Sequence, residues 1–306
     1  MKLYNKNGRR KFVRDVSLFT VSSIILPFQS CNLNSNNIRF GLTTDSHYAD
    51  RSSSGSRYYK QSLEKMREFI KEMNDSKVDF VIHLGDLKDE APDKQEEDTL
   101  RFLREIEQTY AEFKGPRYHC IGNHDLDSIN KEQFLSVVEN TGISKNKSYY
   151  SFDKRGFHFV VLDANYDRNG NSHFYKEGAD WEDTNITPEQ VDWLRQDLKM
   201  NNLPTVIFCH HPLFKYFRDG NKYHVNNFKE IQELINSNQN TISVFQGHVH
   251  EEKFKKIGGV HYITQLGMVD FQGLTNNSFA LIEIGEGKIQ INGYKRTSTK
   301  RKSYRL

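Results

Sequence analysis

Short apolar runs recur along this chain, and several of them stop at an aspartate, an asparagine or a histidine. The first run, residues 38–44, alternates apolar and polar positions and then reaches Asp45, which is typical of a strand entering a loop. The same kind of pattern predicts nine further strands. They span 78–84, 117–121, 149–152, 157–162, 205–209, 241–245, 260–264, 279–284 and 288–294.

Helical periodicity occupies much of the chain between these runs. It predicts helices over 58–73, 98–113, 187–200 and 228–235. The third of these begins with Thr187 as N-cap, Pro188 at the first helical position and Gln190 at the third, a favourable start for a helix. Strands that alternate with helices predict an α/β fold.

Five of the predicted strands are followed within a few residues by side chains that bind metals. These side chains are Asp45 and His47, Asp86, Asn123 and His124, His210, and His248 and His250. In α/β sheets ligands bind at the carboxyl ends of strands, so the five blocks are expected to share one site. Imidazole with carboxylate and amide oxygens suits Mn, Fe, Zn or Ni, and the lack of thiolates disfavours a structural zinc site.

Asp86 is expected to bridge two cations through its two carboxylate oxygens. Gly85, Gly122 and Gly247 precede ligand blocks, where a glycine allows a sharp backbone turn. Each block alone is weak evidence, since Gly-Asp pairs and His-His-Pro segments are common in loops. The ordered set of five is specific.

In this order, the blocks resemble the calcineurin-like metallophosphoesterase superfamily. The resemblance covers about 220 residues and implies a four-layer α/β/β/α sandwich of two mixed sheets flanked by helices, in a domain spanning 38–294. It implies that Asp45, His47, Asp86 and His250 hold one metal, and that Asp86, Asn123, His210 and His248 hold the other. His210 is preferred to His211 as the ligand. His124 is then a catalytic residue beside the phosphate, and Asp125 is expected to orient it through a hydrogen bond.

The resemblance implies a binuclear metal-dependent phosphohydrolase that cleaves phosphodiester or diphosphate bonds with a metal-bridging hydroxide. Mn²⁺ or Fe are the expected metals, with Zn²⁺ as a third candidate. The segments Thr43–Asp50, Tyr149–Ala164 and Gly258–Tyr262 resemble the branch of manganese-dependent ADP-ribose/CDP-alcohol diphosphatases and class III cyclic-nucleotide phosphodiesterases. Val249 departs from the diphosphatases, which usually have an acid there.

Two alternatives stay open for the function. One is a phosphomonoesterase of the same fold, and the other is a metal-binding module without catalysis. A Ser/His/Asp hydrolase is disfavoured because the chain has no Gly-x-Ser-x-Gly segment.

The predicted loop 165–183 is long enough to form a lid over the site. Its aromatic residues could stack on a base or pack the loop onto the domain, and Phe217, Tyr223 and Phe271 share this ambiguity. The loop aromatics are Tyr166, Phe174, Tyr175 and Trp181.

The N-terminus is typical of an export signal. Arg9-Arg10 precedes an apolar stretch over 16–28 and then Cys31, which resembles a twin-arginine signal and, loosely, a lipoprotein cleavage box. We therefore expect a signal over 1–31, a linker over 32–37, and an exported bacterial protein that is periplasmic or membrane-anchored through a lipid on Cys31. Without such a signal the chain would be cytoplasmic.

Composition and charge narrow the remaining classes. The chain has 306 residues with 27% charged and 36% hydrophobic positions, and no apolar run is long enough for a polytopic membrane protein. The net charge of +3 is unevenly distributed along the chain. Residues 1–31 carry +5 and a basic tail over 295–306 carries +6, so residues 32–294 carry −8. An acidic body argues against a nucleic-acid groove and leaves a small phosphorylated substrate as the expected partner. Oligomeric state is not indicated.

Cys120 and Cys209 are expected as buried thiols, with a disulfide between them as the alternative.

Overall fold

Two mixed six-stranded sheets lie face to face in this computed structural model, which describes residues 37–304. The first sheet has the order β14-β13-β12-β1-β2-β3. Its strands are β1 (Ile38–Thr43), β2 (Phe80–His83), β3 (Arg117–His119), β12 (Ser278–Gly285), β13 (Lys288–Lys295) and β14 (Lys300–Ser303). Strands β1, β2 and β3 are parallel, whereas β12, β13 and β14 continue the sheet in antiparallel pairs.

The second sheet has the order β10-β11-β9-β6-β5-β4. Its strands are β4 (Tyr150–Lys154), β5 (Phe157–Leu162), β6 (Thr205–Cys209), β9 (Thr241–Gln246), β10 (Lys253–Ile257) and β11 (Val260–Thr264). The four central strands are parallel and the two edge strands are antiparallel. A small hairpin of β7 (Phe217–Arg218) and β8 (Asn221–Lys222) stands apart from both sheets.

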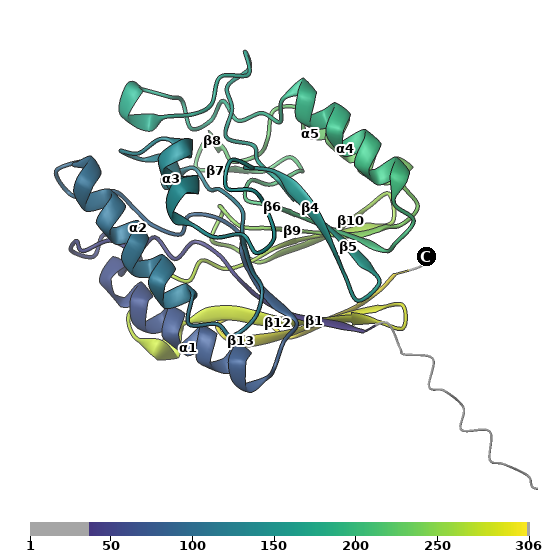
Figure 1. Ribbon diagram of the computed structural model, residues 1–306, viewed down its shortest axis with the longest axis horizontal. Helices are drawn as coiled ribbons and strands as arrows, with labels where there is room; N and C mark the ends of the chain where they lie inside the picture. Colours follow the sequence, from purple (N-terminus) through teal and green to yellow (C-terminus); the bar gives the residue numbers. More distant parts are fainter. Residues whose placement is uncertain (1–36, 305–306) are drawn as a thin grey trace, which may run out of the picture. The chain divides into compact units, whose positions relative to one another are not determined.

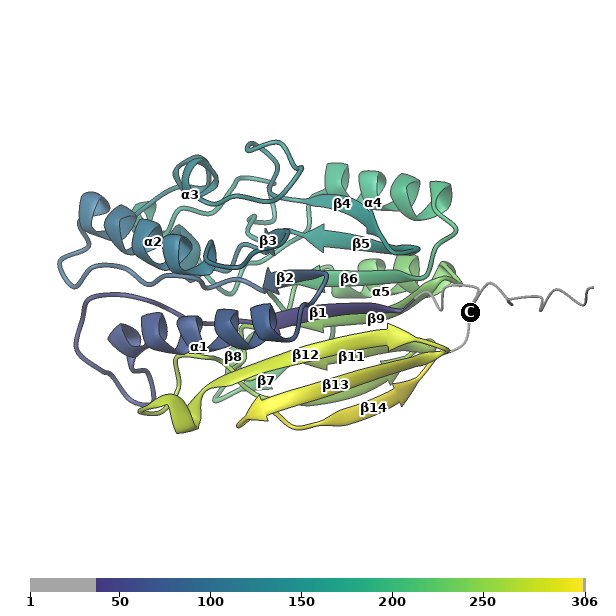
Figure 2. The ribbon, with the colours of Figure 1, turned by 60° about the horizontal axis from the view of Figure 1, so that its bottom comes forward.

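Helices cover the outer face of each sheet, which gives the expected four layers (Figure 1). The helices α1 (Ser62–Asp75), α2 (Glu96–Tyr110) and α3 (Lys131–Val137) pack on the first sheet. The helices α4 (Pro188–Met200) and α5 (Phe228–Ser237) pack on the second. In Figure 2 the first sheet lies in front of the second, with α1 on its near side. Among the described residues, no helix is both long and apolar enough to cross a membrane.

The sheets meet in an aromatic core centred on Phe40. Its ring stacks on Phe80 with centroids 4.8 Å apart and meets Phe159, Phe208 and Phe245 edge-on, the geometries that aromatic pairs prefer. Because side chains alternate along a strand, Ile38, Phe40 and Leu42 all face this core. The core holds β1 rigidly, and with it the residues that follow β1.

The start of α4 agrees with the prediction, whereas the start of α1 does not. Thr187 caps α4 by accepting a hydrogen bond from the Gln190 backbone N–H (3.3 Å), with Pro188 in the first turn, as predicted. The helix predicted from residue 58 begins at Ser62, because a short 3-10 turn, Tyr59–Gln61, precedes it.

The sheet also extends past residue 294, where the domain was expected to end. Residues 300–303 form β14 on the edge of the first sheet, so this part of the basic tail is an edge strand. Cys120 and Cys209 are both buried and free.

Candidate metal centre

The predicted site residues gather at one edge of the sandwich, just beyond the ends of β1, β2, β3, β6 and β9. Five of them have left-handed backbone conformations, with φ between 42° and 69°. Non-glycine residues rarely adopt this region, and such strain is concentrated at functional sites. The five are Asp45, His47, Asp86, His248 and His250.

The three glycines serve two different purposes. Gly85 has φ +104°, which matches the sharp turn that was expected. Gly122 and Gly247 have no positive φ, and a Cβ at either position would collide with a neighbour. The neighbour is Asp86 for Gly122, and Thr44 and Asp45 for Gly247. These two glycines therefore allow close approach of the backbone to the site carboxylates.

Asp45, His47 and His250 form one half of the site. His47 Nε2 lies 3.1 Å from His250 Nε2 and 3.7 Å from Asp45 Oδ1, and His250 Nε2 lies 3.3 Å from Asp45 Oδ1. Asp45 and His47 are completely buried. Two imidazole nitrogens and a carboxylate oxygen thus converge on one small volume, which is the donor set expected for a cation.

Asp86 lies between this half and the second one. Its Oδ2 is 3.4 Å from His47 Nε2 and 3.2 Å from His210 Nε2. His210 also lies close to His211 and His248. The ring centroids of His211 and His248 are 4.5 Å apart. The structure therefore places Asp86 where a bridging carboxylate would have to be.

Four of the atoms expected to bind metal lack hydrogen-bond partners within the described residues. They are Asp45 Oδ1, Asn123 Oδ1, His210 Nε2 and His248 Nε2, all of them buried. A buried polar atom without a partner costs about 1–3 kcal/mol, so four at one place require an external partner. Both nitrogens of His211 are also without partners, but His210 alone of the two contacts Asp86. The residues present fit two metal ions.

The Nδ1 atoms of three of these histidines, His47, His250 and His210, make hydrogen bonds to other groups of the protein. His47 Nδ1 donates to Asp89 (3.2 Å), His250 Nδ1 to Asp270 (2.8 Å), and His210 Nδ1 to the Leu84 carbonyl (2.8 Å). Such outer partners fix the tautomer so that Nε2 presents its lone pair to a metal. Asp89 and Asp270 were not predicted from the sequence. Asp89 follows Asp86 by three residues and could have been noticed, whereas Asp270 has no local signal.

The electrostatics of the site favour added positive charge. Burial alone would lower the pKa of His250, but Asp45 and Asp270 raise it to about 9. Burial likewise opposes protonation of His210, yet Asp86 raises its pKa to about 9. Burial would raise the pKa of Asp86, but the surrounding histidines hold it well below the usual range. The carboxylates thus create a field that attracts cations.

The expected role of Asp125 is wrong. Its carboxylate accepts hydrogen bonds from the backbone N–H groups of Asp86 (2.9 Å), Leu87 (2.8 Å), Lys88 (3.3 Å) and Gly122 (2.8 Å). Within the described residues it makes no hydrogen bond to the His124 ring. Asp125 is therefore a brace that holds the loop carrying Asp86. Asp125 is completely buried beneath that loop, so its carboxylate is directed at the backbone N–H groups of the loop.

The partner of His124 is Asp127 instead. His124 Nδ1 donates to Asp127 Oδ2 at 2.6 Å. The two residues are three apart across the 3-10 turn His124–Leu126, so their side chains lie on the same side. Burial lowers the pKa of His124, but Asp127 and Asp86 outweigh it and raise the pKa to about 10.

A cavity of about 270 Å³ opens directly onto these residues. Metal-binding candidates form its floor, and aromatic and cationic side chains form its walls. The wall residues are Arg57, Tyr175, Trp181, Arg218 and Tyr223. Of the ambiguous aromatics, Tyr175, Trp181 and Tyr223 reach the cavity. Tyr166 and Phe174 line a separate hollow of about 860 Å³, and Phe217 and Phe271 are exposed.

Beside His248, the wall of the cavity consists of aromatic and cationic side chains that contact one another. Trp181 meets the Tyr223 ring edge-on at 5.2 Å, and the Arg218 guanidinium lies 4.7 Å from the Tyr223 ring centre. Arg57 stands elsewhere in the wall, 3.6 Å from Asp89. Neither arginine belongs to one of the five ligand blocks: Arg57 follows His47 by ten residues, and Arg218 lies in β7.

An α/β/β/α sandwich with a carboxylate- and histidine-lined centre at its strand ends is the architecture of a metal-dependent phosphoesterase. The profile of the Calcineurin-like phosphoesterase family matches residues 38–252. The chain belongs to this family, and it is a hydrolase of phosphate esters.

Its relatives include two kinds of enzyme. A manganese-dependent ADP-ribose/CDP-alcohol diphosphatase of Arabidopsis thaliana is 25% identical over 83% of this chain and 93% of the relative. A probable cyclic nucleotide phosphodiesterase of Fibrobacter succinogenes is 24% identical over 70% of this chain and 73% of the relative. A dimetal phosphatase from Danio rerio has the same fold, with a TM-score of 0.74 at 19% identity, over 88% of this chain and 99% of that one.

Proposed function

We propose that this protein uses two metal ions to hydrolyse a phosphodiester or diphosphate bond in a small, nucleotide-like substrate. The observation that carries this proposal is the set of buried, unpartnered oxygen and nitrogen atoms on both sides of Asp86. Asp45, His47, Asp86 and His250 would hold one ion. Asp86, Asn123, His210 and His248 would hold the other.

The donor set supports Mn²⁺ or Fe as the bound metals, with Zn²⁺ as a third candidate. When bound, a pair of such ions supplies Lewis-acid activation of the phosphoryl group and of water. The protein supplies the positioning and the polar contacts around that pair.

His124 is the residue placed to act on the substrate. It lines the cavity beside Asp86 and Asn123, and Asp127 holds its Nδ1. The other ring nitrogen is therefore the one available to a phosphoryl oxygen or to the leaving group. A positioned histidine in this role contributes roughly 10²–10⁴-fold to the rate.

The walls of the cavity support a substrate larger than a phosphate group. Arg57 and Arg218 offer cationic contacts for a second phosphate or a charged group beyond the scissile bond. Trp181 and Tyr223 offer flat surfaces for a base, for which stacking contributes about 1–3 kcal/mol. This combination favours a nucleotide-like diester or diphosphate over a simple monoester.

Hydrolysis assays on residues 32–306 with added Mn²⁺ test the proposal. The substrates are bis-p-nitrophenyl phosphate, p-nitrophenyl phosphate, cyclic AMP, ADP-ribose and a CDP-alcohol. We expect turnover of a diester or diphosphate that a chelator abolishes. Turnover of the monoester alone would identify a phosphatase, and no turnover with two metals bound would identify a non-catalytic module.

We also propose that residues 1–31, which lie outside the described residues, direct export and that Cys31 carries a lipid. The paired arginines, the apolar stretch and the cysteine support this proposal. Fractionation of cells that express the full chain and its Cys31→Ser variant provides the test. Both proteins should leave the cytoplasm, and only the parent should stay with the membrane.

A further inference from the structure

The edge strands of the two sheets lie side by side, and both are rich in lysine and arginine. Lys300 and Lys302 of β14 place their ammonium groups 5.7 Å and 5.2 Å from the ring centre of Phe254 in β10. His261 of β11 donates from Nε2 to the Ser303 carbonyl of β14 at 2.9 Å. The two edges thus form one surface, which we call the basic edge. It consists of Lys253, Lys255, Lys256, Lys300, Arg301 and Lys302.

The charge of the basic edge is largely uncompensated. Within residues 37–304, Lys253 pairs with Glu251 at 3.4 Å, and the other five cations have no ion pair. All six are exposed except Lys302, which is half-buried. The field is felt by His261, whose pKa is lowered by burial and further by Lys256 and Lys302.

The basic edge contrasts with the rest of the domain. Residues 32–294 carry a net charge of −8 even though they include three of these lysines. The basic edge is therefore a local excess of positive charge on a body whose net charge is negative. Such an asymmetric molecule orients in the field of a charged surface.

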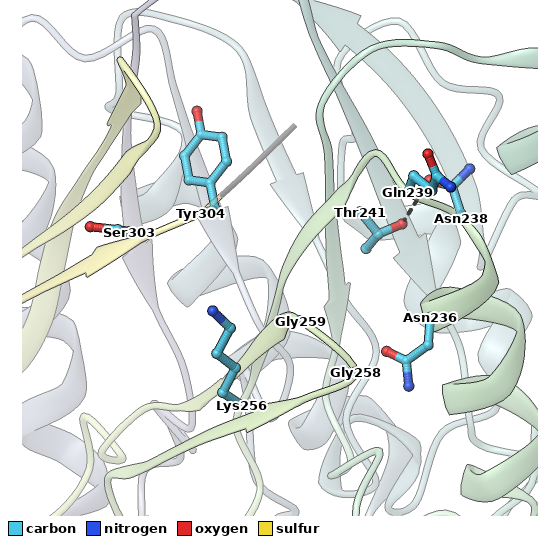
Figure 3. Close-up of a pocket in the computed structure, with 9 residues that line it drawn as sticks. All are labelled: Asn236, Asn238, Gln239, Thr241, Lys256, Gly258, Gly259, Ser303 and Tyr304. Atoms are coloured by element: carbon cyan, nitrogen blue, oxygen red, sulfur yellow. Dashed lines mark hydrogen bonds between the residues drawn. The ribbon is translucent and has the colours of Figure 1, made fainter.

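Part of the basic edge lies at the end of the sandwich where β1 begins. Arg301 and Asn37 line the same surface hollow of about 220 Å³. Lys256, Ser303 and Tyr304 line a neighbouring hollow of about 530 Å³, into which the Lys256 ammonium points (Figure 3). The metal-binding candidates follow the other end of β1, so a surface that contacts this part of the domain would leave their cavity open.

We propose that the basic edge docks on an anionic phospholipid surface. Charge complementarity supports this partner, since each Lys or Arg close to such a surface contributes about 1 kcal/mol. The position of Asn37 supports it as well. Cys31 precedes Ile38 by seven residues, which span at most about 25 Å when extended. A lipid on Cys31 would therefore keep the basic edge within reach of the bilayer, although the docking itself does not require the lipid.

Vesicle flotation tests this docking without the N-terminal signal. Residues 32–306 are suitable because both sheets and all three hydrophobic clusters lie within the compact unit Ser35–Leu306. The vesicles contain phosphatidylcholine either alone or mixed with phosphatidylglycerol. We expect binding only to the mixed vesicles, and its loss at about 1 M salt, where the Debye length is about 3 Å.

A charge-reversed variant and a matched control locate the contact. The variant is Lys256→Glu, Lys300→Glu and Lys302→Glu. The control is Lys114→Glu, Lys199→Glu and Lys229→Glu, which has the same net charge and changes exposed lysines elsewhere. A loss of about five-fold per residue predicts partitioning reduced on the order of 100-fold in the variant. The control should change far less.

Several outcomes would overturn the docking proposal. They are equal binding to neutral vesicles, equal losses in variant and control, and binding to a duplex oligonucleotide without any binding to vesicles. Circular dichroism melting of both proteins identifies a variant that fails to fold, and single Lys300→Gln and Lys302→Gln variants then replace it. Turnover of bis-p-nitrophenyl phosphate in solution should be unchanged in the folded variants. Failure of the docking is therefore distinguishable from failure of the proposed hydrolase function.

Discussion

Replacing Asp127 with asparagine tests how the structure positions His124. The Asp127 carboxylate accepts a 2.6 Å hydrogen bond from His124 Nδ1, and both side chains are largely shielded from water. Asparagine keeps the shape of the side chain but removes its charge. It can also present its amide N–H₂ to the ring, which would favour the wrong tautomer.

The size of the effect follows from that one hydrogen bond. A hydrogen bond to a charged group contributes about 1.5–3 kcal/mol, and about 1.4 kcal/mol corresponds to a tenfold change in rate. We therefore expect kcat/KM of Asp127→Asn to fall roughly 10- to 150-fold. Within the described residues the Asp127 side chain makes no hydrogen bond to a metal-binding candidate, so the metal content should not change.

The assay measures kcat/KM for bis-p-nitrophenyl phosphate at saturating Mn²⁺, together with the metal content per chain. Asp75→Asn is the matched control, because Asp75 is an exposed carboxylate at the end of α1 that pairs with Lys71. Activity within twofold of the parent would refute the role of Asp127. Loss of metal together with activity would show that Asp127 supports the metal centre rather than His124.

Three further predictions concern other groups. Asp86→Asn should remove the shared carboxylate and lower the bound metal below two ions per chain. Activity should fall by more than the roughly 10- to 100-fold that is lost when a residue hydrogen-bonded to a metal ligand is removed. Full metal content with normal turnover would contradict the bridging role. Asp125→Asn should lower the free energy of unfolding in urea by about 1–3 kcal/mol, because four backbone N–H groups lose their charged acceptor; unchanged stability would contradict its role as a brace. The pKa of His158 is raised above its ordinary value of 6.5 because its bonds to Asp197 and Asp153 outweigh burial. Its contribution to stability is therefore complete below that value and is lost as pH rises through the folded-state pKa. The stability gap between the parent and His158→Gln should then be larger at about pH 5 than at about pH 9, and a gap that is constant or grows with pH would show that His158 acts through packing alone.

Much of the fold and of the candidate site was predictable because both follow from local pattern. Alternating apolar residues define β1, a mostly apolar run defines β5, and the carboxyl ends of parallel strands in one sheet share an edge. Ligand blocks placed directly after such strands therefore meet wherever the strands pair. This is why Asp45 and Asp86, which follow the paired strands β1 and β2, could be assigned to one site from their positions in the sequence. His210 follows β6 of the other sheet, and the packing of the two sheets brings it to the same edge.

Only the tertiary structure decided which groups surround that site. Asp270 and Arg57 come from loops without a periodic pattern, and Arg218 comes from the two-residue strand β7, so nothing local indicates where their side chains lie. The choice between Asp125 and Asp127 as partner of His124 depended on how a single 3-10 turn is oriented. The strand β14 was missed because its four residues, Lys300–Ser303, are all polar. Pairing with β13 makes it a strand, since backbone hydrogen bonds to a neighbour can impose an extended conformation that the side chains do not encode.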